Sequence, residues 1–144
     1  MFERYAETAR RCIFFAQQSA TQYGSQTIET EHFLLGILHE DPNVIGRFLP
    51  SKTAKDIRIE VEKHIAKRNV STSIDIPLSL HCKRILTYTA EEAVRLGHRH
   101  IDVGHLLIGV VREEDGIAGK ILRSAGLNVA AMRERMRSGE ATAD

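Results

Sequence analysis

The sequence predicts an all-α protein of eight helices, arranged as two tandem four-helix repeats related by a pseudo-twofold axis. Two observations carry this prediction. The chain of 144 residues matches itself at an offset of 73 residues, and its apolar residues recur at the three- and four-residue spacing of helices. No segment shows the alternation of a β-strand. A duplicated unit of about 70 residues implies that the apolar faces of the two halves pack on each other.

The self-match at offset 73 runs without a gap from residue 11 to residue 49. The identical pairs are Arg11 and Arg84, Ala20 and Ala93, Gly24 and Gly97, Ile28 and Ile101, His32 and His105, Leu34 and Leu107, Gly36 and Gly109, Glu40 and Glu113, Gly46 and Gly119, and Leu49 and Leu122. Chance does not readily produce this, so the second half is predicted to repeat the structure of the first.

The first helix of each repeat carries an apolar stripe. Its members are Tyr5, Ala9, Cys12, Ala16, Ala20 and Tyr23 in the first repeat and Cys82, Ile85, Thr89, Ala93 and Leu96 in the second. Gly24 and Gly97 follow these stripes, and glycine is the usual residue of a left-handed C-terminal cap. We therefore expect the first helices to end there.

The second helices, about residues 31–38 and 104–111, are apolar on nearly every side, which predicts that they are the central buried helices. They contain Gly36 and Gly109, each of which costs about 1 kcal/mol relative to alanine inside a helix. Close crossing with a neighbouring helix is the expected compensation.

Shorter helices complete each repeat. The third are predicted around residues 44–49 and 117–125. The fourth contains Ile57, Val61 and Ile65 in the first repeat and corresponds to residues 129–136 in the second. Basic residues on the fourth helix of the first repeat alternate with acidic ones, which is more typical of a solvated face than of a nucleic-acid site.

The predicted domain covers residues 2–137. The first repeat spans about residues 2–67, a polar linker spans 68–78, and the second repeat spans about 79–137. The polar tail, residues 138–144, is predicted to be disordered.

Composition narrows the function classes. The formal net charge is +1, which argues against nucleic acid and anionic lipid as partners. No apolar run approaches the ~20 residues of a membrane span, and no secretory signal is recognised at the N-terminus, so we expect a cytoplasmic protein. Cys12 and Cys82 lack a C-x-x-C spacing and are interpreted as small buried hydrophobes.

Several segments together resemble the Clp N-terminal domain family, most closely the ClpC-type unfoldases. They are Arg4 and Tyr5, residues 30–36 (T-E-H-F-L-L-G), residues 96–98 (L-G-H), residues 105–109 (H-L-L-I-G), residues 111–113 (V-R-E) and residues 116–118 (G-I-A). The resemblance extends from about residue 2 to residue 137 and includes both repeats.

The resemblance implies a non-enzymatic module, without a cofactor, that binds protein clients and adaptors and passes them to a Clp ATPase ring. The sequence itself contains no G-x-x-x-x-G-K-[ST] phosphate loop. It is therefore expected to be either an excised domain or a stand-alone protein made of this module alone.

For the ClpC branch, the resemblance also implies recognition of phosphorylated arginine, with a glutamate of the T-E-H motif holding the guanidinium. Glu31 supplies this glutamate in the first repeat, but Gly104 stands at the equivalent position of the second. Where the family usually has threonine, the repeats have Ala6 and Ser79. At most one such site is expected.

The predicted ligand- or peptide-binding residues are Glu31, Thr30, Arg4 and Ser79. Glu31 has an equally plausible structural role, complementing the helix dipole while Thr30 caps the first turn. In the second repeat Val103 replaces Thr30, so the cap is expected to move by one residue to Asp102.

The histidines allow a second interpretation. His98, His100 and His105 lie close in sequence, and imidazoles in one stretch can bind zinc or nickel. However, His105 is matched by His32, which has no companion histidines, so both are predicted to bond a backbone carbonyl across the helix pair. The alternatives left open are a stand-alone regulatory protein with another partner and, less favoured, a metal-dependent small-molecule binder.

Overall fold

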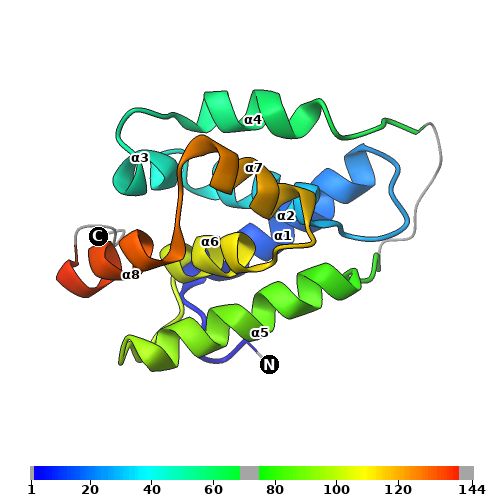
Figure 1. Ribbon diagram of the computed structural model, residues 1–144. Helices are drawn as coiled ribbons and strands as arrows, with labels where there is room; N and C mark the ends of the chain where they lie inside the picture. Colours follow the sequence, from blue (N-terminus) through cyan, green and yellow to red (C-terminus); the bar gives the residue numbers. More distant parts are fainter. Residues whose placement is uncertain (1, 69–74, 140–144) are drawn as a thin grey trace.

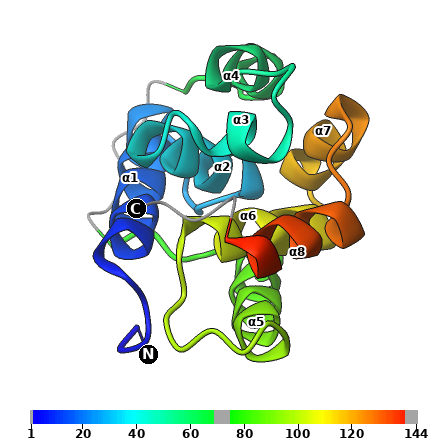
Figure 2. The same cartoon turned by 90° about the vertical axis from the view of Figure 1, so that its left-hand side faces the viewer.

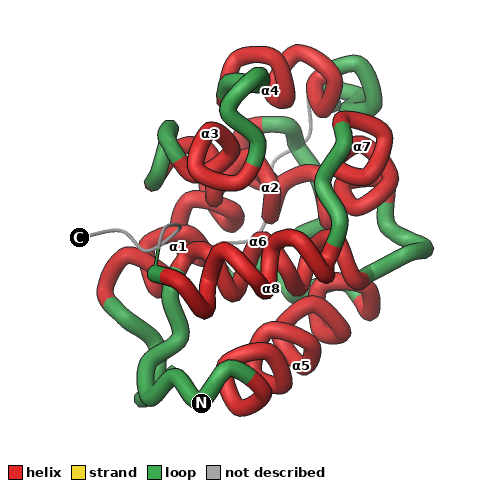
Figure 3. The backbone as a smooth tube through the Cα atoms, turned by 60° about the vertical axis from the view of Figure 1, so that its left-hand side comes forward, coloured by secondary structure: helices red, strands yellow, loops and turns green. Residues whose placement is uncertain are grey.

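The computed structural model describes residues 2–68 and 75–139, and its regular secondary structure there consists of eight helices (Figure 1). They are α1 (Glu7–Gln22), α2 (Thr30–Glu40), α3 (Val44–Phe48), α4 (Ala54–Glu62), α5 (Leu80–Arg95), α6 (Val103–Arg112), α7 (Ile117–Ala125) and α8 (Val129–Ser138). The described residues contain no β-strand, as Figure 3 shows. The all-α prediction is confirmed.

Two helix ends differ from the prediction. The first-repeat helix α4 stops at Glu62, so Ile65 lies beyond it. The second-repeat helix α8 continues into the predicted tail and ends at Ser138, because Gly139 takes a left-handed C-cap conformation with φ 80°. The linker residues 69–74 and the tail residues 140–144 lie outside the described residues.

The central helices α2 and α6 lie between α4 on one side and α5 on the other (Figure 2). Two isolated β-bridges join the repeats, one between Tyr5 and Ile101 and the other between Ile28 and Leu78. Adding 73 to Tyr5 and Ile28 gives Leu78 and Ile101, so each bridge is the counterpart of the other. The segment before each repeat's first helix therefore pairs with the other repeat, as a pseudo-twofold axis requires.

The predicted close helix crossings are present. A Cβ at Gly36 would clash with the carbonyl oxygen of Cys12 on α1, and one at Gly109 would clash with the hydroxyl of Thr89 on α5. Each central helix thus packs directly on the backbone of its repeat's first helix, a contact that only glycine allows.

Both cysteines are buried and unpaired, as predicted. Burial raises the pKa of the Cys82 thiol to about 12, so this group behaves as an inert hydrophobe. Over the described residues, no helix combines the length and the apolar composition that a membrane span requires.

Candidate ligand site at the start of helix α2

The two central helices are capped at equivalent positions. The N-cap of α2 is Glu29, whose backbone N–H donates to Nδ1 of His32 at 3.0 Å. The N-cap of α6 is Asp102, whose backbone N–H donates to Nδ1 of His105 at 2.9 Å. The expectation that Thr30 caps α2 is therefore wrong, and the cap does not move between repeats. The histidines accept backbone N–H groups rather than bonding carbonyls, because they are the third residue of a capping box.

Glu31 lies on the first turn of α2 and is half-buried. Its carboxylate accepts a hydrogen bond from the Thr30 hydroxyl at 2.9 Å. The same hydroxyl accepts the backbone N–H of Ala118, in the first turn of α7, at 3.3 Å. Thr30 is buried, so its role is to position Glu31 beside the N-terminus of α7.

Ser79 is the N-cap of α5, and its hydroxyl accepts the backbone N–H of Cys82 at 3.2 Å. Burial is the largest cause of the raised pKa of Cys82, and the negative charges of Glu29 and Glu31 raise this pKa further. The backbone N–H of Ser79 donates to the carbonyl oxygen of Ile28 at 3.0 Å, so α5 begins next to the segment that leads into α2. The positive ends of α5 and α7 thus lie on the side of the molecule where Glu31 is found.

Arg4 is placed elsewhere. Its guanidinium donates to the carbonyl oxygens of Arg99 at 3.2 Å and His98 at 3.3 Å, in the loop between α5 and α6. It also lines a pocket of about 510 Å³ together with Phe2 and Leu78. The structure shows no hydrogen bond or ion pair between the described side chains of Arg4 and Glu31. Arg4 holds a loop of the second repeat, a role that the sequence did not indicate.

The second repeat is closed at the position equivalent to Glu31. A Cβ built on Gly104 would lie 2.6 Å from Sδ and 3.0 Å from Cε of Met136 on α8. The N-caps of α4 and α8 are Thr53 and Asn128, which are 75 residues apart, so the first-repeat counterpart of Met136 is Val61, a buried residue of α4. Helix α8 therefore covers Gly104, the position at which the second repeat has no carboxylate.

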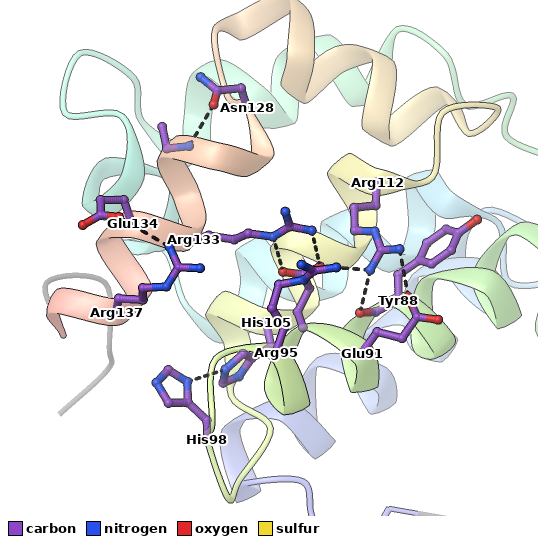
Figure 4. Close-up of polar contacts among 12 residues, drawn as sticks. Tyr88, Glu91, Arg95, His98, His105, Arg112, Asn128, Arg133, Glu134 and Arg137 are labelled. Carbon is purple, nitrogen blue, oxygen red and sulfur yellow. Dashed lines mark hydrogen bonds and ion pairs between the residues drawn. The ribbon is translucent and has the colours of Figure 1, made fainter.

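The histidines form a pair that the sequence did not predict. His98 Nδ1 lies 2.8 Å from His105 Nε2 (Figure 4). Because Nδ1 of His105 accepts the Asp102 N–H, we assign its proton to Nε2, which donates to His98. Both ring nitrogens of His105 are thus engaged. Among the described residues, no group of three or more His, Cys, Asp or Glu side chains is placed to hold a metal ion.

A buried carboxylate in the second repeat was also missed. Glu92 on α5 is fully buried and accepts two hydrogen bonds from Arg133 on α8, at 2.7 and 2.8 Å, and one from Arg112 on α6 at 2.9 Å. Figure 4 shows the two guanidinium groups converging from different helices. Burial by itself would raise the pKa of Glu92, but Arg133 and the neighbouring arginine charges lower it below its ordinary value. The charged carboxylate thus joins three helices.

Comparison with known proteins assigns nearly the whole chain to one family. The sequence profile of the Clp repeat (R) N-terminal domain matches residues 4–125 and 78–140. The chain is 38% identical to chaperone protein ClpC2, chloroplastic, of Oryza sativa subsp. japonica, over 94% of this chain and 15% of that protein. It is also 38% identical to the ATP-dependent Clp protease ATP-binding subunit ClpA homolog of Porphyra purpurea, over 92% of this chain and 16% of that protein. The chain therefore spans about a sixth of the length of these relatives.

Solved structures show the same fold. The N-terminal domain of the caseinolytic protease associated chaperone ClpD from Arabidopsis thaliana superposes with a TM-score of 0.75 at 30% identity, covering 95% of this chain and 97% of that one. The Hsp104 N-terminal domain from Candida albicans superposes with a TM-score of 0.76 at 16% identity, covering 97% and 94% of the two chains.

Proposed function

Since the chain belongs to the Clp repeat (R) N-terminal domain family, we propose that it is a non-enzymatic module that receives protein substrates or adaptors for a Clp ATP-dependent chaperone or protease. Its relatives are named as chaperones and as ATP-binding subunits of the Clp protease. The expected partners are protein clients, adaptor proteins or a Clp ATPase ring. A cytoplasmic location stays a prediction, and some of the relatives are chloroplastic.

The ligand we propose is a phosphorylated arginine of a client protein, bound at one site by Glu31. A carboxylate pairs with a planar guanidinium through two charge-assisted hydrogen bonds. Backbone N–H groups at helix N-termini favour a phosphate, and both α5 and α7 begin with a backbone N–H bonded to the segment around the start of α2, from Ser79 to Ile28 and from Ala118 to Thr30. The observation that carries the proposal is this half-buried carboxylate, held by a Thr30 hydroxyl that also accepts the backbone N–H of Ala118 at the start of α7. The covered Gly104 supports a stoichiometry of one.

The metal-dependent alternative is less well supported by the geometry. A metal ion on His105 would have to displace either the Asp102 N–H bond or the His98 bond, and both are short. A stand-alone regulatory protein differs from the leading proposal in its partner rather than in its binding surface, so it is tested by the same capture experiments.

Calorimetric titration with an arginine-phosphorylated peptide tests the ligand. We expect one site, and Glu31→Ala should weaken binding by roughly ten- to hundredfold, because charge-assisted hydrogen bonds contribute ~1.5–3 kcal/mol. The unfolding temperature should change little, since the α2 cap uses Glu29 and His32. Glu134→Ala is the matched control: it removes the same charge from an exposed position on α8.

Two equal sites, or full affinity after Glu31→Ala, would contradict the assignment to Glu31. Absence of peptide binding, together with capture of an unfolded client, an adaptor or a Clp ATPase, would remove phosphoarginine and leave the wider proposal standing. Failure to capture any of these partners, with and without nucleotide, would contradict the wider proposal.

A further inference from the structure

A groove of about 460 Å³ lies between α4 of the first repeat and α7 of the second, which pack on α2 and on each other (Figure 1). On the α4 side it is lined by the buried Ile57. On the α7 side it is lined by Ile117, Ile121 and Ala125, which are spaced four residues apart and so share one face of the helix. Each of these three residues is partly exposed. The apolar face that α7 presents to this α4–α7 groove is therefore incompletely covered.

The pseudo-twofold axis gives the α4–α7 groove a counterpart between α8 and α3, and that counterpart is filled. The N-caps of α3 and α7 are 73 residues apart, so Phe48 is the counterpart of Ile121. A Cβ built on Gly104 would lie 3.5 Å from Cζ of Phe48 and 2.6 Å from Sδ of Met136, so the phenyl ring packs beside α8. Phe48 is 8% exposed, whereas the smaller Ile121 is only partly buried. The α4–α7 groove thus lacks the large apolar side chain that fills its counterpart.

Two lysines at the rim of the groove have no ionic partner. Lys52 precedes α4 and Lys120 lies on α7, so they stand on opposite walls. Among the residues that the structure describes, neither side chain forms a hydrogen bond or an ion pair. Arg47, the counterpart of Lys120, is by contrast paired with Asp41. The groove therefore offers two cations to a ligand, whereas the equivalent cation of α3 is already neutralised.

The two acidic residues at the rim are engaged within α4. Asp56 accepts the backbone N–H and the hydroxyl of Thr53, at 2.9 and 3.0 Å, as part of the capping box of α4. Glu60 pairs with Lys63 at 2.8 Å. Because both carboxylates have partners of their own, they do not neutralise the two lysines by direct pairing.

We propose that the α4–α7 groove binds a polypeptide segment in which a large apolar residue is flanked by carboxylate side chains. The apolar side chain occupies the space that the Phe48 ring fills at the counterpart, and its burial supplies most of the affinity. The flanking carboxylates meet Lys52 and Lys120 on the two walls and select against a basic segment. The size of the groove is that of ordinary ligand pockets.

This inference rests on the proposed function in that its ligand is a polypeptide. It adds a second contact, with its own chemistry, to the phosphoarginine site. Glu31 is not among the residues that line the groove, so the two sites can be tested separately.

The chain contains no tryptophan, so the emission of a tryptophan peptide reports binding directly. The probe is a Gly/Ser-rich peptide with a central Glu-Trp-Glu, and its emission should shift to the blue on binding to the wild-type chain. Two matched peptides carry Glu-Ala-Glu and Lys-Trp-Lys instead. Competition should show the alanine peptide to be weaker by at least about tenfold. The lysine peptide should be severalfold weaker, and added salt should weaken binding of the probe.

Three variants locate the site. Ile121→Phe copies Phe48 and should weaken binding of the probe by at least about tenfold, because the new ring occupies the groove. Lys120→Glu changes an exposed residue, so the fold should be retained; it should weaken the probe severalfold and strengthen binding of the lysine peptide. Lys83→Glu is the matched control: it makes the same charge change at an exposed position of α5, on the other side of the central helices, and should bind as the wild type does.

Weaker binding in Ile121→Phe and Lys120→Glu, with retention in Lys83→Glu, supports the proposal. No emission shift with the wild-type chain, equal affinity for the alanine peptide, or a loss in Lys83→Glu instead of Lys120→Glu would each overturn it. Glu31→Ala should bind the probe as the wild type does. Failure of the groove would therefore leave phosphoarginine binding and the capture of Clp partners unchanged, which separates it from failure of the proposed function.

Discussion

The two repeats have the same order of four helices but differ in which surfaces of those helices are covered. The first leaves the Glu31 carboxylate partly exposed and has Ser19 on α1, whereas the second covers Gly104 with Met136 and joins α5 to α8 through Glu92 and Arg133. The positions that stay identical are mainly core residues and the glycines of close crossings. The fold is therefore maintained by shared packing, while the binding surface diverges at partly exposed positions of the same helices.

One pair of equivalent positions shows how this divergence works. In the first repeat, Phe15 packs against His39 with ring centroids 4.1 Å apart. In the second, the Arg112 guanidinium lies 4.4 Å above the Tyr88 ring and also reaches Glu92. The change from imidazole to guanidinium adds donors for a buried carboxylate, and that carboxylate holds α8 through Arg133. The ion pair of Glu92 with Arg133 thereby holds α8 in place, and α8 carries the Met136 side chain that covers Gly104.

The largest expected effect comes from separating the repeats. Residues 1–70 expressed alone should be unfolded or self-associated, because the fragment loses both inter-repeat bridges and exposes the face of α2 that packs on the second repeat. NMR dispersion and sedimentation measure the outcome. A well-dispersed spectrum from a monomeric fragment would show that the first repeat is an independent domain, and the comparison would then be between two domains.

The next effect compares the second repeat, in which Glu92 and Arg133 join α5 to α8, with the first, in which Ser19 stands in place of Glu92. Glu92→Ala should reduce the free energy of unfolding by about 3–5 kcal/mol, because it leaves two arginines without the carboxylate that they share. Ser19→Ala at the equivalent position should cost less than about 1 kcal/mol. Chemical denaturation measures both, and Glu134→Ala, which removes a carboxylate from an exposed position paired with Arg137, is the charge control. Similar losses of unfolding free energy for Glu92→Ala and Ser19→Ala would show that the ion pairs of Glu92 do not stabilise the second repeat.

The sequence predicted those structural features that depend on local residue chemistry or on periodic spacing. The eight helices, the glycine crossings at Gly36 and Gly109 and the left-handed caps at Gly24 and Gly97 follow from spacing and from the chemistry of glycine, and the structure confirms them. The cap of α2 was misassigned because Thr30 is the stronger intrinsic cap, while the capping box of Glu29 with His32 depends on a histidine at its third position.

Long-range polar contacts could not be predicted in this way. Glu92 and Arg133 are 41 residues apart and Arg4 meets Arg99 across 95 residues, so no periodic pattern connects them. One signal was available: Glu92 lies three residues after Thr89, beside the apolar stripe of α5, where a carboxylate needs a partner. Equivalence with Ser19 shows only that the position differs between repeats, not what it binds.

The histidine pair provides the smallest expected effect and distinguishes the repeats by pH. Burial, with a further contribution from His98, lowers the pKa of His105 to about 4. Burial also lowers the pKa of His32, but Glu31 and Glu29 oppose that change. Ser25 stands at the position equivalent to His98, so the first repeat has no imidazole pair. The two capping histidines are thus equivalent in geometry but not in their response to protons.

An unfolded chain protonates this histidine near pH 6.5, whereas the folded chain resists protonation until about pH 4. The unfolded state therefore binds more protons within this window, and stability should fall as the pH falls, by about 3 kcal/mol in total from His105. Denaturation measured across the window should show a shallower pH dependence in His105→Gln than in the wild type. His32→Gln should reduce the pH dependence of stability by less than His105→Gln does. Equal pH dependence in the wild type and His105→Gln would mean that burial and the neighbouring His98 do not keep His105 neutral.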